Sequence, residues 1–455
     1  MTLQKKGMMG VLGTAVAVTA LAGVPAFVFA ADQTPEELQR RVLELERELE
    51  QARKELAVAE EARAEVDEQV VEAERKLETI VPAPAKVKVG DLTIGGAIRA
   101  NYVIGDYPGN GGASRAWEDG GTFELDTFRV NLDYLSGPWV GKLEYRWYQD
   151  DFRGGGYNFL HTGWVGYNFE DDSQVQVGVN RVPFGPGPYG VSQSWLFDQH
   201  YYLGLSDDMD LGVKYSRIFD DWAFDFAYYA ASEGTYTGRT KDSARYSYDV
   251  VDETGNGYEE RNQFNIRGIY TLPDTSIDTA LGFSLQYGEL RSEGPQDDGD
   301  HHAASVHMVN KWGNFTLASQ LTYFKFDVDA GQPLGMADRV QMGAYDFPST
   351  AAAEGWIPAV SLSYFHQTPG IPWLNYVIPY AEYSSVVKEK SGFNDSELFI
   401  LGAAWGHGGW YIYTDMAWSN GNEFVGGDAA FGDRLGANAD DKWQERFNIN
   451  FGYYF

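Results

Sequence analysis

The stretch that decides the fold is the run Phe447-Asn448-Ile449-Asn450-Phe451-Gly452-Tyr453-Tyr454-Phe455. Apolar and polar side chains alternate along it, and it finishes on an aromatic residue. Alternation with a period of two is the pattern of a β-strand with one apolar and one polar face. The run therefore predicts strands that stand between lipid on one side and water on the other.

The same period recurs throughout the chain from Leu92 onward. We count sixteen segments with it, at 92–102, 123–135, 139–149, 159–169, 174–182, 210–219, 222–231, 262–271, 277–287, 303–312, 314–327, 356–366, 374–385, 397–406, 410–418 and 444–455. The pattern predicts an all-β transmembrane barrel of 16 antiparallel strands over residues 91–455. Segments 303–312 and 374–385 alternate weakly, so fourteen or eighteen strands stay open. The last segment also resembles the terminal strand by which outer-membrane barrels are recognised for insertion.

Connection lengths alternate as a barrel requires. Tight turns lie at 136–138, 170–173, 220–221, 273–274 and 408–409, and Gly/Asp/Asn-rich connections lie at 105–122, 183–209, 232–261, 328–355 and 419–443. Short periplasmic turns opposite long extracellular loops are typical of outer-membrane barrels. A soluble β-sandwich has no reason to keep this alternation over sixteen strands.

The first 90 residues differ in character. An apolar run from Met8 to Phe29 follows Lys5 and Lys6 and precedes Ala30, which predicts a signal peptide over 1–30; an uncleaved anchor is the alternative. Apolar residues at steps of four and three from Leu38 onward predict a periplasmic α-helical coiled coil over 31–81. A lone surface helix would show a wider apolar stripe. A Pro/Ala linker is expected over 82–90, and the seam implies a homo-oligomer, for which we expect a trimer.

Composition excludes several classes. The 455 residues have a mean hydropathy of −0.37, so a bundle of transmembrane helices is excluded. The net charge of −31 argues against nucleic acid as a partner. The chain has no cysteine, so its stability must come from hydrogen-bonded strands and packing.

Two further features carry a family resemblance. Gly178-Val179-Asn180-Arg181-Val182-Pro183-Phe184-Gly185 is similar to the strand-ending motif of the phosphate-selective porin O/P family, and Leu211-Gly212-Val213-Lys214-Tyr215 follows after a long loop. The chain resembles that family over roughly residues 90–455. The layout of coiled coil plus barrel is similar to that of dicarboxylate-type trimeric porins. Both resemblances imply a trimeric channel, and neither identifies the solute.

Strand parity assigns the side chains that would line a pore. Opposite the apolar faces lie charged residues, namely Arg99, Arg129, Lys142, Arg146, Lys214, Arg267, Asp133, Glu144, Asp225, Asp278 and Asp415. The loop at about 183–209 is the candidate constriction, because its prolines, aromatics and acids can fold compactly against the basic wall. Its candidate residues are Pro183, Phe184, Trp195, Asp198, Tyr201, Tyr202, Asp207 and Asp208. A solvated lumen of paired charges, and a loop packed only on the surface, are the alternatives.

We therefore predict an outer-membrane porin of a Gram-negative bacterium that passes small polar solutes or ions by passive diffusion. Lipid and lipopolysaccharide would surround it, and the coiled coil could reach the cell wall. Alternatives are an anion- or carbohydrate-selective channel and a structural tether. No catalytic residue, cofactor or metal site is expected. His161 and His307 lack a Ser/Asp constellation, and 297–302 is interpreted as a hydrated loop. The similarity of 252–257 to the start of a calcium loop is interpreted as accidental, because its twelfth position is Gln263 instead of glutamate.

Overall fold

The computed structural model describes residues 86–109, 114–149, 155–273, 276–427 and 432–455. The signal peptide, the coiled coil and residues 82–85 of the linker lie outside the described residues. No helix of the described residues is long and apolar enough to cross a membrane.

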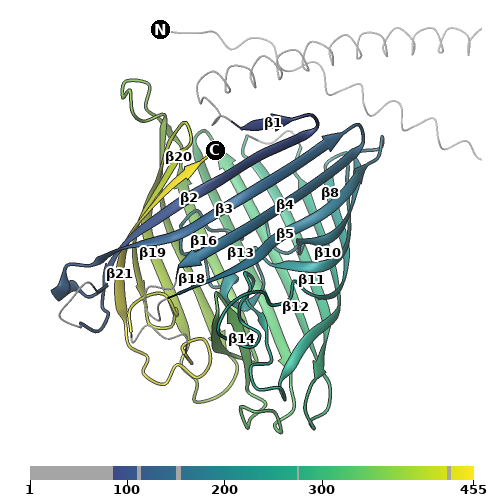
Figure 1. Cartoon of the computed structure of the whole chain (residues 1–455), viewed down its shortest axis with the longest axis vertical. Coiled ribbons are helices and arrows are strands. Elements are labelled where there is room, and N and C mark those ends of the chain that lie inside the picture. The colour runs from purple at the N-terminus through teal and green to yellow at the C-terminus, as the bar shows by residue number, and fades with distance from the viewer. Residues whose placement is uncertain (1–85, 110–113, 150–154, 274–275, 428–431) are drawn as a thin grey trace, which may run out of the picture. The chain divides into compact units, whose positions relative to one another are not determined.

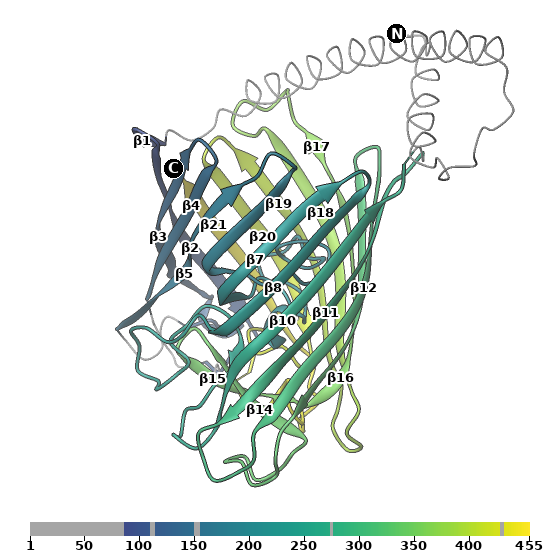
Figure 2. The same ribbon diagram turned by 90° about the vertical axis from the view of Figure 1, so that its right-hand side faces the viewer.

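Sixteen long antiparallel strands form one closed barrel, each strand paired with the next along the chain (Figures 1 and 2). They are β2 (Leu92–Gly105), β3 (Thr122–Ser136), β4 (Trp139–Gln149), β5 (Gly156–Asn168), β6 (Ser173–Arg181), β7 (Met209–Phe219), β8 (Trp222–Ser232), β10 (Tyr258–Thr271), β11 (Asp278–Ser292), β12 (Gly299–Trp312), β13 (Phe315–Asp327), β16 (Glu354–Tyr364), β18 (Tyr376–Lys388), β19 (Ser396–His407), β20 (Trp410–Ser419) and β21 (Gln444–Tyr454). The prediction of 16 antiparallel strands is confirmed. The weakly alternating segments are the strands β12 and β18.

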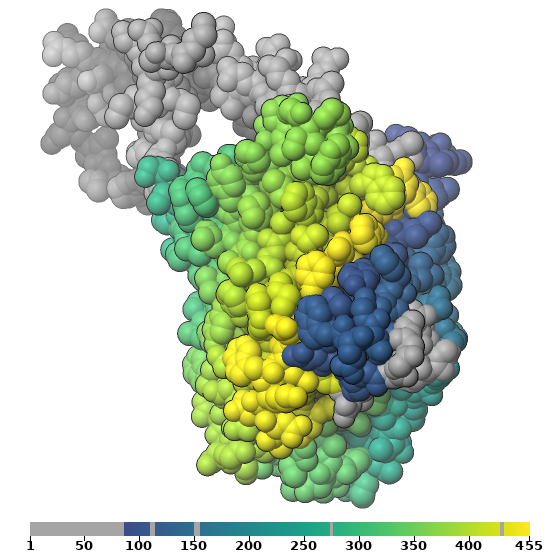
Figure 3. All heavy atoms as spheres, turned by 90° about the vertical axis from the view of Figure 1, so that its left-hand side faces the viewer, coloured from purple at the N-terminus to yellow at the C-terminus, as the bar shows by residue number. Residues whose placement is uncertain are grey.

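The last strand closes the barrel against the first. β21 pairs with β2 from Ala97↔Tyr454 to Gly105↔Arg446, so the first and last strands lie side by side in Figure 3. The backbone N–H of Phe455 donates to the Gly96 carbonyl at 3.0 Å, and the N–H of Gly96 donates to the Phe455 carbonyl at 2.8 Å. Because the first strand pairs with the last, neither of them is left as a free edge of the sheet.

The two faces of the wall have opposite chemistry. On β11 the side chain of Leu285 is exposed and that of Ser284 is buried, and on β12 Val306 is exposed and Ser305 is buried. Exposed aromatic side chains gather where strands meet the short turns, among them Trp139, Trp312, Phe315, Trp410 and Tyr453. An apolar exterior with aromatic strand ends and a polar interior is the arrangement of a barrel solvated by lipid.

Short elements decorate the barrel, and one differs from expectation. β1 (Val87–Val89) pairs with the start of β2, although its residues were expected to be linker. β17 (His366–Gln367) pairs with β18. Within two of the long connections, β9 (Asp249–Val250), β14 (Arg339–Ala344) and β15 (Phe347–Ala352) form a three-stranded sheet. Two loops far apart in sequence thereby pair their backbone groups with each other.

Candidate functional site

The connection between β6 and β7 leaves the wall at the Gly178–Gly185 motif. Gly178 has a φ of +128°, and a Cβ atom there would lie 2.4 Å from the Gly163 carbonyl oxygen on β5, so only glycine fits. Phe184 is buried among core side chains. The N–H of Gly185 donates to Ser284 Oγ of β11 at 3.0 Å. The chain therefore leaves its own wall directly after β6 and turns inward to contact β11, four strands away around the barrel.

The loop then makes contact with strands opposite the one it left. Glu382 of β18 accepts hydrogen bonds from Ser192 Oγ at 2.7 Å and from the N–H of Gln193 at 2.5 Å. The N–H of Trp195 donates to Asp415 of β20 at 3.2 Å. Further contacts join the N–H of Gln199 to Ser384 Oγ of β18 at 3.1 Å and His200 Nε2 to Thr322 Oγ1 of β13 at 2.8 Å. The loop thus crosses the inside of the barrel.

Aromatic rings hold the returning half of the loop. Around the short helical turn η3 (Tyr201–Leu203), the ring of Tyr201 stacks on Phe197 with a centroid distance of 4.3 Å. It also lies 5.5 Å from Tyr248 of the next long loop, and its hydroxyl contacts that of Tyr345. Burial raises the pKa of the Tyr201 phenol well above its usual range. Three long connections therefore pack as one body inside the barrel.

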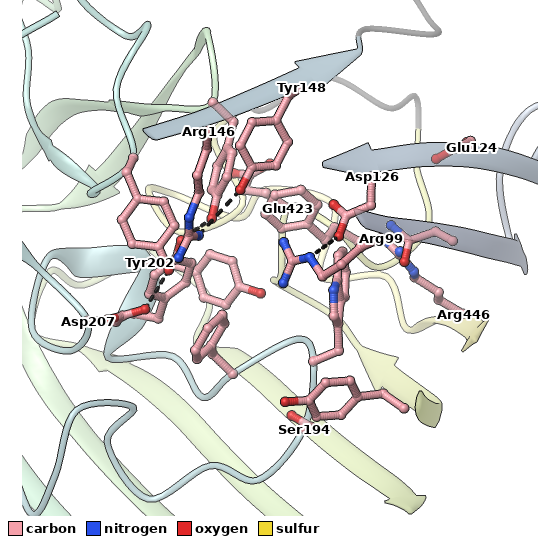
Figure 4. Close-up of a pocket in the computed structure, with 18 of the residues that line it drawn as sticks. Arg99, Glu124, Asp126, Arg146, Tyr148, Ser194, Tyr202, Asp207, Glu423 and Arg446 are labelled. Carbon is pink, nitrogen blue, oxygen red and sulfur yellow. Dashed lines mark hydrogen bonds and ion pairs between the residues drawn. The ribbon is translucent and has the colours of Figure 1, made fainter. Parts of the chain in front are cut away.

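A cavity of about 420 Å³ lies between this loop and the wall formed by β2, β3, β4, β20 and β21 (Figure 4). Its lining combines tyrosines with charged side chains. Five arginines reach it, Arg99, Arg115, Arg129, Arg146 and Arg446. A cavity with this lining can hold water and a small charged or polar solute.

Acids of the same strands pair with most of these arginines. Arg99 Nε lies 2.8 Å from Asp126 Oδ2. Glu144 Oε1 is shared, because it lies 3.0 Å from Arg129 Nη1 and 2.5 Å from Arg146 Nη2. Arg115 pairs with Glu124 at 2.5 Å. Two guanidinium groups for one carboxylate at Glu144 leave local positive charge.

Arg446 of β21 has a different environment. Its guanidinium donates to the Phe424 carbonyl at 3.0 Å and to Asn448 Oδ1 at 2.7 Å, and it lies over the Trp195 ring, 5.1 Å from the centroid. It forms no ion pair with a carboxylate of the residues that the structure describes. Arg446 therefore adds a second uncompensated positive charge to the cavity lining.

The other predicted bases and acids form a separate group on β6, β7, β8 and β10. Arg267 pairs with Asp225 at 2.7 Å, and Lys214 Nζ donates to the Arg181 carbonyl at 2.7 Å. Arg181 pairs with the loop acid Asp207, also at 2.7 Å. This is the one predicted loop acid that contacts a basic side chain of the barrel wall in the described part of the chain.

The remaining predicted residues lie elsewhere. Asp198 stays within the loop, 2.8 Å from His200 Nδ1, and Asp208 lies among other buried acids. Lys142 and Asp133 are neighbours in the register of β3 and β4, near the short turn, and Asp278 is exposed at the start of β11. The expected opposition of a basic wall and an acidic loop is therefore found only at Arg181 and Asp207 among the described residues. Arg99 and Arg129 pair instead with acids of the neighbouring strands β3 and β4.

Strand parity missed Glu124, Asp126, Arg115 and Arg446, which all reach the cavity or pair there. A bulge explains Asp126: β2 pairs Arg99 with Thr127 and Ala100 with Leu125, so Asp126 has no partner and the inner face changes phase. The sequence does indicate this bulge. The outward-facing apolar residues Phe123, Leu125 and Phe128 are spaced by two and then by three residues, where an unbroken strand would keep a spacing of two. Arg446 follows ordinary parity with Asn448 and was simply not singled out.

Known proteins resemble the chain in fold. No protein-family model matches it, and no curated protein matches it in sequence. The outer membrane channel DcaP of Acinetobacter baumannii shares 12% identity over 82% of this chain and 100% of that chain, with a TM-score of 0.52. The outer-membrane expressed OmpT of Vibrio cholerae shares 13% identity over 82% of this chain and 100% of that one, with a TM-score of 0.47. An anion-selective porin from Comamonas acidovorans shares 11% identity over 80% of this chain and 99% of that chain, with a TM-score of 0.46.

Proposed function

We propose that this chain is an outer-membrane porin, through which small polar or charged solutes diffuse passively in a water-filled channel. The observation that carries the proposal is the inner loop: residues 182–208 run across the inside of a closed barrel and leave a charged cavity of about 420 Å³ beside the wall. Pore radius and local charge decide which solutes pass such a narrowing.

The apolar exterior supports an outer-membrane location, with lipid and lipopolysaccharide around the barrel. The fold likeness to the channel DcaP is consistent with this assignment. We further propose a homotrimer, for which the heptad pattern over 31–81 is the support. Phosphate is not proposed as the solute, because acids pair with most of the arginines that line the cavity.

Single-channel recording in planar bilayers tests the porin assignment. The purified, refolded full chain is expected to give discrete conductance steps. A barrel that inserts, as judged by protease protection in liposomes, but gives no steps would show that the structural-tether alternative is correct.

A preference for anions is the second candidate, and the unpaired Arg446 together with the shared Glu144 favours it. Arg446→Gln is expected to shift the reversal potential in a salt gradient toward cations, because it removes a positive charge from the narrowing. Arg217→Gln is the matched control, since Arg217 pairs with Asp171 on the exposed side of the wall. Equal shifts in both variants would contradict the assignment.

The carbohydrate alternative receives less support. Of the three rings expected to form an aromatic slide, Trp195 is half-buried and lies under the Arg446 guanidinium, 5.1 Å from it. Tyr201 and Tyr202 offer little ring surface to a sugar, because they are 2% and 1% exposed. Their rings are packed against Phe197, Tyr248 and Phe424 instead.

A further inference from the structure

Five acidic side chains meet where the inner loop rejoins the barrel wall. Asp208 ends the loop, Asp210 lies on β7, Glu233 follows β8, Asp249 lies on β9 and Glu260 lies on β10. All five are buried, with exposed fractions between 1% and 7%. One carboxylate oxygen each from Asp208, Asp210 and Asp249 lie within 4.8 Å of one another.

Little positive charge compensates these acids. The only ion pair made by the five, among the described residues, joins Asp249 Oδ2 to Arg245 Nη1 at 2.7 Å. That guanidinium also pairs with Asp242. Burying uncompensated carboxylates is strongly unfavourable unless they are protonated or bind a cation.

The hydrogen bonds of the cluster are one-sided. Asp210 Oδ2 accepts from Gln263 Nε2 at 3.1 Å, and Glu233 Oε1 accepts from the N–H of Ser247 at 2.8 Å. Asp249 uses Oδ2 for its arginine. Asp208 Oδ1 and Asp210 Oδ1 have no hydrogen-bond partner, and the carboxyl groups of Glu233 and Asp249 lie against each other with no N–H or O–H donor for their second oxygens. In metal sites, a ligand carboxylate binds the ion through one oxygen while surrounding groups hold the other oxygen by hydrogen bonds and orient the side chain. The acids of this cluster are arranged in the same way.

We propose that Asp208, Asp210 and Asp249 bind a divalent cation, with Glu233 beside them as a further oxygen ligand. Ca²⁺ is the ion that the site fits best, because it takes several carboxylate oxygens at about 2.3–2.6 Å, so that opposite ligands are about 4.6–5.2 Å apart. The spacing of 4.8 Å or less matches this range. Mg²⁺ needs near-octahedral geometry and keeps several waters, which a buried carboxylate cage does not favour.

The ion would join three segments that the chain brings from different places. Asp208 ends the inner loop, Asp249 belongs to the loop between β8 and β10, and Asp210 belongs to the wall. The N–H of Met209 donates to Ser247 Oγ at 2.9 Å, so the start of β7 already contacts the loop between β8 and β10 beside the site. A bound ion fastens the end of the inner loop to the barrel. This inference does not depend on the proposed function, because the site is independent of what passes through the barrel.

Protonation is the competing explanation. Burial, together with the charges of Asp210 and Asp249, raises the pKa of Asp208 well above its usual range, and burial beside Asp249 does the same for Glu233. Neutral acids would need no ion. The two explanations differ in their response to calcium.

Calcium binding to the refolded full chain provides the test. After treatment with EDTA and dialysis, equilibrium dialysis with radioactive Ca²⁺ is expected to show one saturable site per chain, with a Kd at or below about 1 mM. Saturating Ca²⁺ is expected to raise the unfolding temperature, and Mg²⁺ at equal concentration to raise it less. Asp210→Asn and Asp208→Asn are each expected to weaken binding by at least about tenfold. Asp440→Asn, at an exposed acid of another loop, is expected to bind as the unaltered chain does.

Two results would overturn the proposal. One is the absence of a Ca²⁺ site that the variants abolish. The other is an unfolding temperature that changes with neither Ca²⁺ nor EDTA, in variants that are as stable as the unaltered chain. That result is expected if the acids are protonated and bind no ion. If Asp210→Asn does not refold, Asp208→Asn decides the question. Asp208 precedes β7, and its backbone carbonyl, which accepts from the N–H of Val182 at 2.9 Å, is unchanged by the substitution.

Discussion

Glu144 is the residue on which the charge balance of the cavity depends. It is 4% exposed, and one of its oxygens lies within hydrogen-bonding distance of both Arg129 and Arg146. His161 Nδ1 is 3.8 Å from the same oxygen. A single carboxylate therefore offsets the repulsion between two guanidinium groups on neighbouring strands.

Replacing this carboxylate with an amide should alter selectivity and stability together. Glu144→Gln is expected to shift the reversal potential toward anions, because both arginines lose their counter-charge. It is also expected to lower the free energy of unfolding by about 1–3 kcal/mol, the cost of leaving buried charged groups without a charged partner. The temperature at which the barrel unfolds in SDS gels reports the second effect. Glu170→Gln, at an exposed turn, is the control, and equal behaviour of the two variants would argue against this role.

Glu423 gives the cavity a dependence on pH. It lies in the loop after β20, accepts hydrogen bonds from the N–H groups of Gly432 at 3.0 Å and Arg434 at 3.1 Å, and lines the cavity. Burial raises its pKa from 4.5 to about 7. The folded state thus binds the proton of Glu423 more tightly than the unfolded state does. The stabilisation that this protonation gives to the folded state is complete below pH 4.5 and is lost as the pH rises through about 7.

The same titration should be visible in transport. Above pH 7 the ionised Glu423 offsets neighbouring positive charge, so the preference for anions is expected to weaken with a midpoint near pH 7. Reversal potentials recorded across this range, with Glu423→Gln in parallel, check the prediction. A midpoint that persists in the variant would assign the titration to another group.

At the scale of elements, the strands of the barrel could be predicted from the sequence, but the pairing between distant loops could not. Alternation is local, so even β12 and β18 could be found from neighbouring residues alone. The bulge at Asp126 also leaves a local trace, in the step from Leu125 to Phe128. By contrast, β9 and β14 pair Val250 with Met342, and no local pattern links residues so far apart. The acid cluster was missed for the same reason, because Asp208 and Asp249 meet only in the folded chain.

The inner loop should be removable without loss of the barrel. β6 and β7 pair from Ser173↔Arg217 to Arg181↔Met209, and this register does not involve the loop. Replacing residues 187–200 with a short Gly/Ser linker is therefore expected to preserve folding and to raise single-channel conductance severalfold. The replacement removes the contacts of the loop with Glu382, Asp415, Ser384 and Thr322, which carry it across the bore. Shortening the connection at 294–297 by the same method is the control. Unchanged conductance in the first variant would show that the loop is not the narrowing.

At the scale of the whole molecule, the barrel and the N-terminal segment have separate requirements. The wall closes on itself through β2 and β21, so each barrel satisfies its own backbone and needs no partner to fold. The heptad pattern over 31–81 has the opposite property, because a narrow apolar seam is stable only when another helix covers it. If the chain is a trimer, association should therefore depend on the segment more than on the barrel.

Deleting residues 31–81 tests whether folding of the barrel and association of the subunits depend on different parts of the chain. The shortened chain is expected to fold and to conduct in single steps of unchanged size, since the strands and the inner loop are intact. Its oligomer is expected to dissociate at lower detergent concentration or temperature, as measured by light scattering with size-exclusion chromatography. Arg63→Leu in the full chain should have the opposite effect. Arg63 lies four residues after Ala59, at a position where the heptad pattern calls for an apolar residue, so its replacement by leucine is expected to strengthen association. An oligomer that is indifferent to both changes would place the contacts between subunits on the barrel wall instead.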